Sequence, residues 1–259
     1  MDVKFYYPRF HDMIKDFLSY IDEDTMEDTI KTLHYYYFDI DVEYTYTLNY
    51  EEQTEYLYSI LKDVYIKQEA LLKQKVTLFE TSWKKYQEQI TNALSKAFHY
   101  DTHTCFNDLH CCINIHPLMS HDLVNHRFDI FYLEDEKGMI GYTIHELIHF
   151  LWFDLWHKTF HDDFREYDTP SLKWISSELI LVPIMNDECL HNINPFFICE
   201  RTGEINETFY DLKINNQYIL QIIDDMYHQY PIQEFMKHAY QFVQSHEEAI
   251  RQHIYSSQQ

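Results

Sequence analysis

Glycine is nearly absent from this sequence, with only 3 among 259 residues. Globular proteins average about 7% glycine, so a fold rich in tight turns, such as an all-β fold, is disfavoured. The phosphate-binding patterns Gly-x-Gly-x-x-Gly and Gly-Lys-Ser/Thr do not occur. The sequence therefore argues against the common dinucleotide-binding and P-loop nucleotide-binding sites.

Basic residues are also scarce, because 20 Lys and Arg face 43 Asp and Glu and leave a formal net charge of −23. Such a charge repels phosphate backbones and anionic lipids, so we expect neither a nucleic acid nor a membrane surface as a partner. A basic peptide or protein would be attracted. A soluble, self-repelling surface is the simpler explanation of the charge.

Long hydrophobic runs are missing as well. The longest, at residues 148–153, stops at Asp154 and falls far short of the ~18 residues of a membrane span. The first eight residues lack the basic segment and apolar stretch that mark a signal peptide. Five cysteines are an odd number and fit reduced thiols. We therefore expect a soluble, cytoplasmic protein.

Helical periodicity dominates the first hundred residues and the C-terminal part. Apolar residues at spacings of three and four predict helices at 10–21 and 51–98, the second being one long helix or two joined by a kink. The chain from residue 217 is predicted to be helical with a break at Pro231. Between the first two helices, residues 39–47 alternate in the manner of a short strand.

The middle of the chain predicts a small sheet and more helices. The expected elements are strands at 112–116 and 127–133, a polar turn at 134–138, and helices at 139–157 and from the N-cap Ser171 towards Pro183. The fold class is therefore α+β and predominantly α-helical. A soft boundary near 98–105 divides a helical N-terminal region (1–98) from the rest (99–259), unless the chain is a single domain.

The most informative segment is a His-Glu-x-x-His pattern formed by His145, Glu146 and His149. Histidines four apart lie on one face of a helix, so both imidazoles can bind one metal ion. Glu146 lies about 100° around the helix from His145, beside the ligand face, where its carboxylate can accept a proton from water. Uncharged residues at 142–144, 147–148 and 150–151 indicate a buried helix. The alternative, hydrogen-bonded core histidines, is less favourable because burying His and Glu without a metal is costly.

A catalytic zinc ion needs a third protein ligand and one open position. The extension His-Glu-x-x-His-x-x-Gly-x-x-His fails, because Trp152 and Leu155 stand where glycine and histidine would. Glu178 is a lone carboxylate in a nearly apolar helix, and zinc would compensate its charge. A buried Tyr, Arg or His beside Glu178 is the alternative. Rival ligands, in more polar surroundings, are Asp154, His157, His161 and Glu166.

This motif and the Glu178 helix resemble the gluzincins, the thermolysin-like clan of zinc metallopeptidases, over about residues 127–185. The resemblance implies a zincin-like region at 99–259, a two-helix zinc-binding core and an edge strand at 127–133 that pairs with an extended peptide. The second carboxylate of some gluzincin branches is missing, because residue 182 is valine. A weaker resemblance is to small cytoplasmic His-Glu-x-x-His proteins of regulatory type.

The predicted function is that of an intracellular zinc metallopeptidase acting on a peptide or protein, which the charge would attract if it were basic. One Zn²⁺ on His145, His149 and Glu178 would lower the pKa of its water towards ~7. Glu146 would act as the general base and pass the proton to the leaving amine. A donor to the oxyanion is expected among Tyr167, His191 and His228.

Two other functions fit the same residues. One is a non-catalytic, metal-stabilised regulatory or protein-interaction module, which would enclose its metal or lack one. The other, weaker alternative is a metallohydrolase that acts on a non-peptide amide. Peptidase activity instead requires a cleft that is open to a peptide beside the site.

Histidine and cysteine are concentrated between residues 99 and 126, which hold six histidines and three cysteines. A second metal site is conceivable there, but no Cys-x-x-Cys pair occurs and no common zinc module has this spacing. We expect a histidine-rich surface and strand region. The aromatic run at 35–38 is expected to be core or an interface patch.

Overall fold

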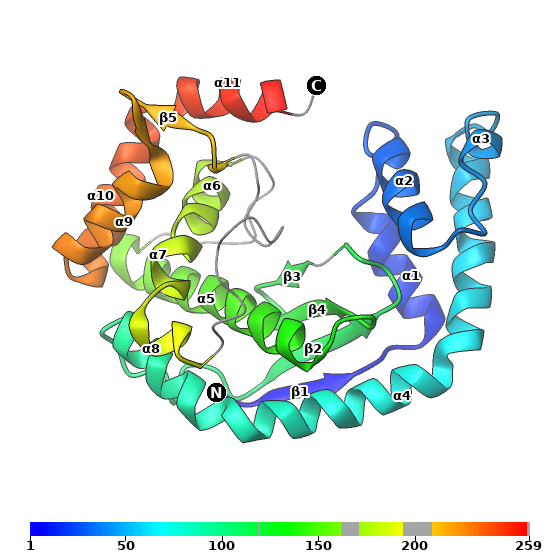
Figure 1. The fold of residues 1–259 in the computed structure, drawn as a ribbon, viewed down its shortest axis with the longest axis horizontal. Coiled ribbons are helices and arrows are strands. Elements are labelled where there is room, and N and C mark those ends of the chain that lie inside the picture. The colour runs from blue at the N-terminus through cyan, green and yellow to red at the C-terminus, as the bar shows by residue number, and fades with distance from the viewer. Residues whose placement is uncertain (119, 162–170, 194–208, 258–259) are drawn as a thin grey trace.

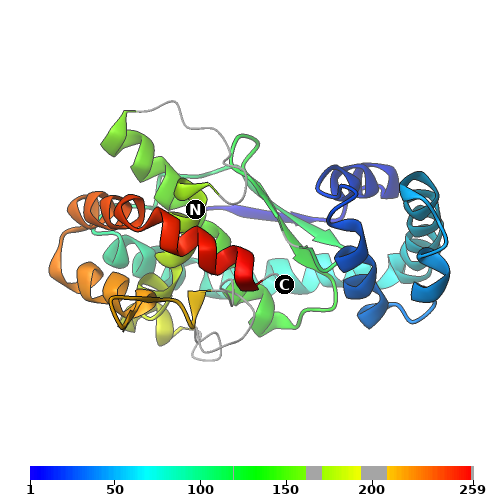
Figure 2. The same cartoon turned by 90° about the horizontal axis from the view of Figure 1, so that it is seen from above.

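The computed structural model describes residues 1–118, 120–161, 171–193 and 209–257. Within this part of the chain the fold is α+β and predominantly helical, as predicted, with a four-stranded mixed sheet and a two-stranded sheet. Figure 1 shows the four-stranded sheet between the N-terminal helices and the C-terminal helices, with the long helix α4 running below it. Figure 2 shows the same two groups of helices at opposite ends of the molecule.

Helix α4 (Tyr50–Ala97) is one continuous helix of 48 residues, which decides between the two predicted possibilities. Its start is fixed by a capping box. The Asn49 side chain accepts the backbone N–H of Glu52, and the Glu52 side chain accepts the backbone N–H of Asn49. No glycine or proline interrupts the helix, so it can extend from the N-terminal helices to the C-terminal half.

The four-stranded sheet has the order β1-β2-β4-β3. Its strands are β1 (Val3–Tyr6), β2 (Leu109–Asn114), β4 (Arg127–Phe131) and β3 (His121–Asp122). The first three are parallel, and β3 is antiparallel to β4 at an edge. Strand β1 was not predicted, and it joins residues on both sides of the boundary expected near 98; that boundary stays a prediction.

The prediction that residues 127–133 form the edge strand is wrong. Strand β4 pairs with β2 on one side and with β3 on the other, so β3 forms the edge of the sheet within the described part of the chain. The misassignment has a simple cause, because β3 has only two residues and therefore shows no alternating pattern in the sequence. The other predicted strand, 112–116, is present but lies earlier, at Leu109–Asn114.

One face of the sheet packs on the long helices. Phe5 of β1 contacts Phe79 of α4, and Phe128 of β4 contacts Phe150 of α5 (Glu136–Phe160), with ring centroids 6.3 and 6.4 Å apart. His121 of β3 is directly opposite Phe128 in the strand register. Opposed residues of paired strands point to the same face, so His121 faces α5.

The N-terminal helices are α1 (Phe10–Ser19), α2 (Met26–Tyr36) and α3 (Val42–Thr45). The strand predicted at 39–47 is wrong, because the segment contains helix α3. Asp41 is the N-cap of that helix, and its side chain accepts the backbone N–H of Tyr44 at 3.0 Å. A local capping bond thus prevails over an alternation that has no neighbouring strand to pair with.

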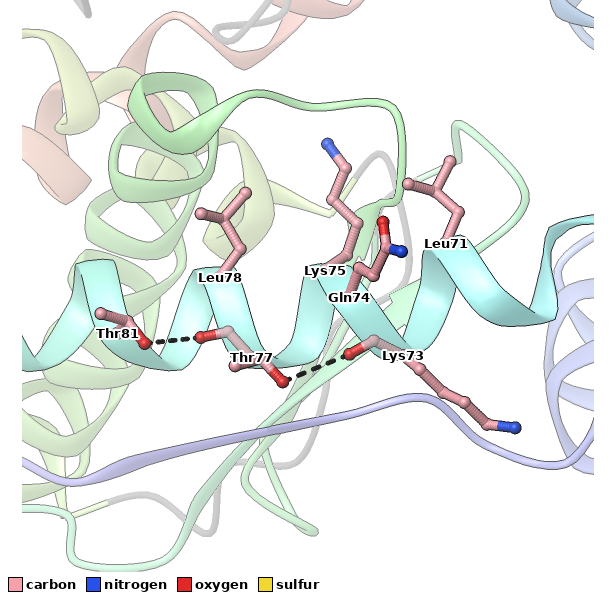
Figure 3. Close-up of a pocket in the computed structure, with 7 residues that line it drawn as sticks. All are labelled: Leu71, Lys73, Gln74, Lys75, Thr77, Leu78 and Thr81. Carbon is pink, nitrogen blue, oxygen red and sulfur yellow. Dashed lines mark hydrogen bonds between the residues drawn. The ribbon is translucent and has the colours of Figure 1, made fainter.

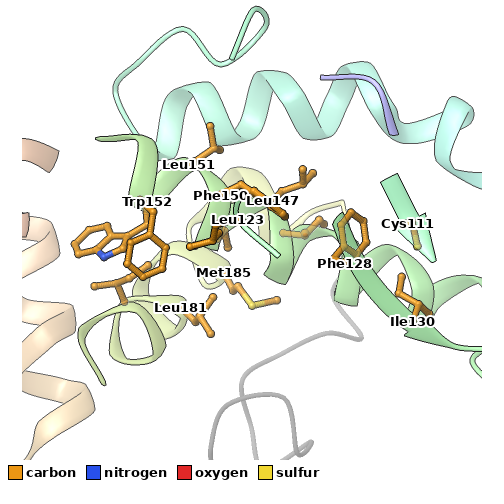
Figure 4. Close-up of a cluster of buried hydrophobic side chains, with 14 of the residues drawn as sticks. Cys111, Leu123, Phe128, Ile130, Leu147, Phe150, Leu151, Trp152, Leu181 and Met185 are labelled. Carbon is orange, nitrogen blue, oxygen red and sulfur yellow. The ribbon is translucent and has the colours of Figure 1, made fainter. Parts of the chain in front are cut away.

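Helix α5 is buried around most of its circumference. It begins at Glu136 with Asp135 as its N-cap, three residues before the predicted start and inside the predicted turn. Figure 4 shows side chains of α5 and α7 (Leu181–Met185) packed with those of strands β2 and β4. Trp152, which replaces the glycine of the extended motif, is fully buried and contacts Phe235. Packing on both sides fixes the direction in which the α5 histidines point.

Short helices and a C-terminal bundle complete the described chain. Ser171 caps α6 (Leu172–Leu179) as predicted, and α8 (Glu188–His191) follows α7. A hairpin of β5 (Lys213–Ile214) and β6 (Gln217–Tyr218) leads to helices α9 (Ile219–Gln229), α10 (Ile232–Ser245) and α11 (Glu247–Ser257). The predicted break at Pro231 is confirmed, since this residue is the N-cap of α10. None of the helices described combines the length and apolar character needed to cross a bilayer.

Candidate metal centre

The structure places His145 and His149 one turn apart on α5, as the motif predicts. Their Nε2 atoms are 3.1 Å apart. His149 is 1% exposed and His145 is partly buried. Within the described chain, the Nδ1 atoms of both rings are buried and have no hydrogen-bond partner. The two imidazoles are therefore held by packing, with their Nε2 atoms directed at one point.

Glu178 of α6 completes a group of three possible metal ligands. Its Oε1 lies 3.5 Å from the Nε2 of His149, and the ligand atoms of His145, His149 and Glu178 all lie within 4.8 Å of one another. Helix α6 packs against α10, and α7 packs against α5, so the C-terminal bundle brings the carboxylate to the α5 histidines. Two helices separated in the sequence thus supply one cluster.

The spacing of this cluster fits a zinc ion. Zinc bonds to imidazole nitrogen and carboxylate oxygen are about 2.0–2.2 Å long, so two ligand atoms of a tetrahedral site lie roughly 3.3–3.5 Å apart. The separations of 3.1 Å between the two histidines and 3.5 Å between His149 and Glu178 are close to that edge length, and the third pair, His145 and Glu178, lies within 4.8 Å. Two imidazoles and one carboxylate are also a donor set that zinc commonly takes.

Burial sets the charges of these ligands. Burial raises the pKa of Glu178 to about 8, with His121 opposing that shift and Glu146 adding to it. Burial likewise lowers the pKa of His145 and holds that of His149 well below the usual range. Both imidazoles are therefore neutral at pH 7 and keep a lone pair for a metal. A cation at this point would also offset the cost of ionising Glu178.

Glu146 occupies a different environment on the same helix. It is 5% exposed, and its Oε2 lies 2.9 Å from Nδ1 of His121. Burial acts to raise the pKa of Glu146, but the His121 charge and hydrogen bond, with a contribution from His145, outweigh it and the pKa falls. Glu146 is therefore an ionised carboxylate beside the three ligands and outside their group.

His121 is the residue of this site that the sequence did not single out. Its ring centroid lies 4.9 Å from that of His149, with the ring planes 34° apart, in addition to the contact with Glu146. In the sequence His121 is one of six histidines in a short span. Only the pairing of β3 with β4 places it over α5. The histidine-rich composition was the available signal, and the strand register was the missing information.

The rival ligands among the described residues lie outside the cluster. Asp154 pairs with Lys158 at 2.6 Å, His157 is exposed, and His161 ends α5 in a left-handed conformation with φ of 55°. Glu166 and the oxyanion candidate Tyr167 lie outside the described residues. The other two oxyanion candidates do not join the ligand group: His191 lies on α8, and His228 is exposed on α9 beside Asp224.

The remaining histidines of the 99–126 span are spread over several environments. His116 is buried against Phe17, and its burial lowers its pKa to about 4. His103 and His126 pair with aspartates 101 and 108 at 2.9 Å. His110 contacts Tyr6 edge to face. Among the residues described, His145, His149 and Glu178 are the one group found to have metal-binding geometry.

A hollow of about 650 Å³ on the surface of α4 lies elsewhere and has different chemistry. Figure 3 shows its lining, which comes from a single helix and includes Leu71, Lys75 and Leu78. It contains no histidine, cysteine or carboxylate. The cluster on α5 and α6 is therefore the better candidate for chemistry.

The chain was compared with known proteins in three ways. No model of a known protein family matches it, and no curated protein and no solved structure gives a significant match.

Proposed function

We propose that this protein is a zinc-dependent hydrolase and, more specifically, a metallopeptidase. One observation carries the proposal. The ligand atoms of His145, His149 and Glu178 all lie within 4.8 Å of one another, and Glu146, an ionised carboxylate outside this group, follows His145 directly on the same helix. A purely structural site needs the ligands alone, whereas hydrolysis also needs a base.

His145, His149 and Glu178 would hold the ion. A bound Zn²⁺ would supply Lewis acidity and a water molecule of lowered pKa. Three protein ligands leave one position of a tetrahedral site for that water or for a substrate carbonyl.

Glu146 would perform the proton transfers. Its lowered pKa keeps the carboxylate ionised, so it can accept the proton of the attacking water and deliver it to the leaving nitrogen. His121 supports this role, because an ionised carboxylate only accepts hydrogen bonds and Nδ1 of His121 must therefore carry the proton between them. The imidazole thus holds Glu146 in one orientation and favours its charged form.

The sheet supports a peptide as the substrate. Strand β3 is the edge of the sheet, and its residue His121 reaches the site. An extended peptide can add to an exposed edge through backbone hydrogen bonds, with its side chains reaching alternate faces. A peptide laid along β3 would pass beside Glu146.

One observation favours the second candidate, a metal-stabilised module without catalysis. His149 and Glu178 are only 1% and 8% exposed, so an ion there would be largely enclosed. The two functions differ in whether the ion keeps an exchangeable position, because an enclosed structural ion has all four positions filled.

The test combines metal analysis with one substitution. The purified protein should contain about one zinc per chain, and Glu146→Gln should retain it. Against a library of fluorogenic peptides, the parent should cleave at least one member, and Glu146→Gln should be slower by ~10²-fold or more. Zinc in both proteins without cleavage by either would support the module. Equal cleavage by both would disprove the proposed role of Glu146, and the absence of zinc from the parent would reject the zinc-dependent hydrolase.

A further inference from the structure

The N-terminal part of the chain carries a strong local charge. Residues 20–55 contain eleven Asp and Glu and a single lysine, a net formal charge of −10 out of −23 for the whole protein. That lysine, Lys31, binds Glu27 at 2.7 Å on α2. Almost half of the negative charge is therefore concentrated on a segment that forms α2, α3 and the start of α4.

The same segment exposes an unusual number of aromatic side chains. Twelve large hydrophobic residues are exposed among those described, and six of them lie between residues 20 and 46. The most exposed are Phe38 at 81% and Tyr35 at 72%, with Tyr36 at 38% beside them. We call Tyr35, Tyr36 and Phe38, at the end of α2, the aromatic turn. Single exposed aromatics are ordinary, whereas a group of this kind marks an interaction surface.

The aromatic turn is held in place rather than frayed. Between its members, Tyr37 is buried and its hydroxyl donates to the backbone carbonyl of Ile115. Two residues after the turn, Ile40 is fully buried, and its carbonyl lies 2.7 Å from Nδ1 of His34. The ring of Tyr36 packs edge to face on Phe131 of β4, with centroids 4.8 Å apart. Anchors before, within and after the turn thus present its exposed rings in a fixed arrangement.

We propose that the aromatic turn is a docking surface for a cationic, extended peptide segment that carries arginine or lysine side chains. Arginine and lysine have apolar stems and charged heads, so they can lie along Tyr35 and Phe38 while the carboxylates of residues 20–55 attract their charges. Asp39 and Glu43, which follow the turn in the sequence, are both exposed and supply negative charge close to it along the chain. A preorganised surface loses little conformational entropy on binding, which favours such an interaction.

Charge complementarity selects this occupant over the alternatives. The local charge of −10 disfavours nucleic acid and anionic lipid. A second copy of the chain would bring the same negative surface against this one. A neutral apolar partner would gain nothing from the carboxylates of this segment. The inference is independent of the proposed hydrolase activity, because no residue of the metal centre takes part.

The experiment uses the full-length protein and a fluorescein-labelled, twelve-residue peptide of alternating arginine and serine, with a glutamate-serine peptide as the charge control. Fluorescence anisotropy should show binding of the arginine peptide alone. The double variant Tyr35→Ala/Phe38→Ala should raise Kd by about 5- to 10-fold, as expected for truncated aromatic anchors. The matched double variant Ile66→Ala/Val124→Ala removes side chains that are 63% and 67% exposed elsewhere, and it should leave Kd within about twofold.

Two further variants separate the possible causes. Asp39→Asn/Glu43→Gln should weaken binding and reduce its salt dependence, because fewer charges then attract the peptide. Glu178→Ala should bind the peptide like the parent, which distinguishes this surface from the metal centre. If Tyr35→Ala/Phe38→Ala binds the peptide as tightly as the parent, the general charge of the protein is responsible and the docking surface is rejected. Failure of the parent to bind the arginine peptide would reject it equally.

Discussion

The candidate metal centre and the N-terminal helices are both rich in carboxylates. Those of the metal centre are buried away from solvent, whereas those of the N-terminal helices are exposed to it. Glu146 and Glu178 are 5% and 8% exposed, so neighbouring groups decide whether each is charged. On α2 the Glu27 side chain is 59% exposed, and its pKa is lowered by the hydrogen bond and charge of Lys31. In the proposed functions, a few buried carboxylates would serve one cation, whereas many exposed carboxylates would attract a cationic chain.

Within the metal centre the same comparison separates the two glutamates. Glu146 has the Nδ1 of His121 at 2.9 Å and a lowered pKa. Glu178 has the Nε2 of His149 at 3.5 Å, but burial keeps that imidazole neutral and the pKa of Glu178 rises to about 8. Environments that move two carboxyl pKa values apart are typical of sites in which one group is the base and the other has a different role.

The largest effect is expected from Glu178→Ala. This variant removes one of three ligands, so its zinc affinity should fall by more than the ~10- to 100-fold that loss of an outer hydrogen-bond partner costs. His157→Ala, an exposed position on the same helix as His145, is the matched control and should bind zinc like the parent. Competitive titration against a chelating dye measures both. Should the control lose zinc while Glu178→Ala keeps it, the third ligand is not Glu178.

The stability of the metal-free protein should depend on pH through Glu178. A carboxyl group whose pKa rises from 4.5 to about 8 on folding binds more protons in the folded state than in the unfolded state between those values. Its contribution to stability is therefore fully present below pH 4.5 and is lost as the pH rises to about 8. The free energy of unfolding lost over this range is on the order of 4 kcal/mol.

Glu178→Gln isolates that contribution, because the amide has no proton to lose. The difference in unfolding free energy between Glu178→Gln and the metal-free parent, measured by urea denaturation, should grow in favour of Glu178→Gln from pH 5 to pH 8. Zinc, when bound to the parent, should remove the loss of stability that the metal-free parent shows as the pH rises. A difference that stays constant with pH would show that the carboxyl group ionises freely in the folded state.

A smaller effect is expected at His121, whose proposed role is to hold Glu146 through the 2.9 Å contact between them. His121→Ala should lower kcat by roughly 10-fold with little change in KM, because Glu146 is still present but no imidazole holds its carboxylate in one orientation. His121→Asn keeps an N–H donor near the position of Nδ1 and should restore much of the rate. In a Glu146→Gln background, the His121 substitution should have no further effect. Additive losses would assign His121 a role separate from Glu146.

Local signals in the sequence were sufficient for the helical half of the site. The spacing of His145 and His149 follows from the helical period, and Glu178 stood out as a lone charge among apolar residues. The structure brings all three together. The cap at Ser171 and the helix break at Pro231 were also predicted, because each depends on chemistry within a few residues.

Non-local pairing was beyond the reach of the sequence. The edge strand β3 is two residues long, and His121 faces the site only because it is opposite Phe128 in the register. Strand β1 joins a partner more than a hundred residues away, Leu109 to Asn114. At residues 39–47 a real alternation was overruled by the capping bond of Asp41, because a strand without a neighbour has no ladder to stabilise it.

The smallest expected effects test the exposed half of the comparison. Asp39 and Asp41 are both exposed and lie two residues apart, but the Asp41 side chain accepts the backbone N–H of Tyr44 and caps α3. Asp41→Ala should therefore lower the unfolding free energy by about 1 kcal/mol. Asp39→Ala should change it by less than about 0.5 kcal/mol, because an exposed charge without a structural bond contributes little. Urea denaturation at pH 7 compares the two. If both variants lost the same unfolding free energy, the charge of the segment and not the cap would stabilise this turn. If neither variant lost any, α3 would not need its cap.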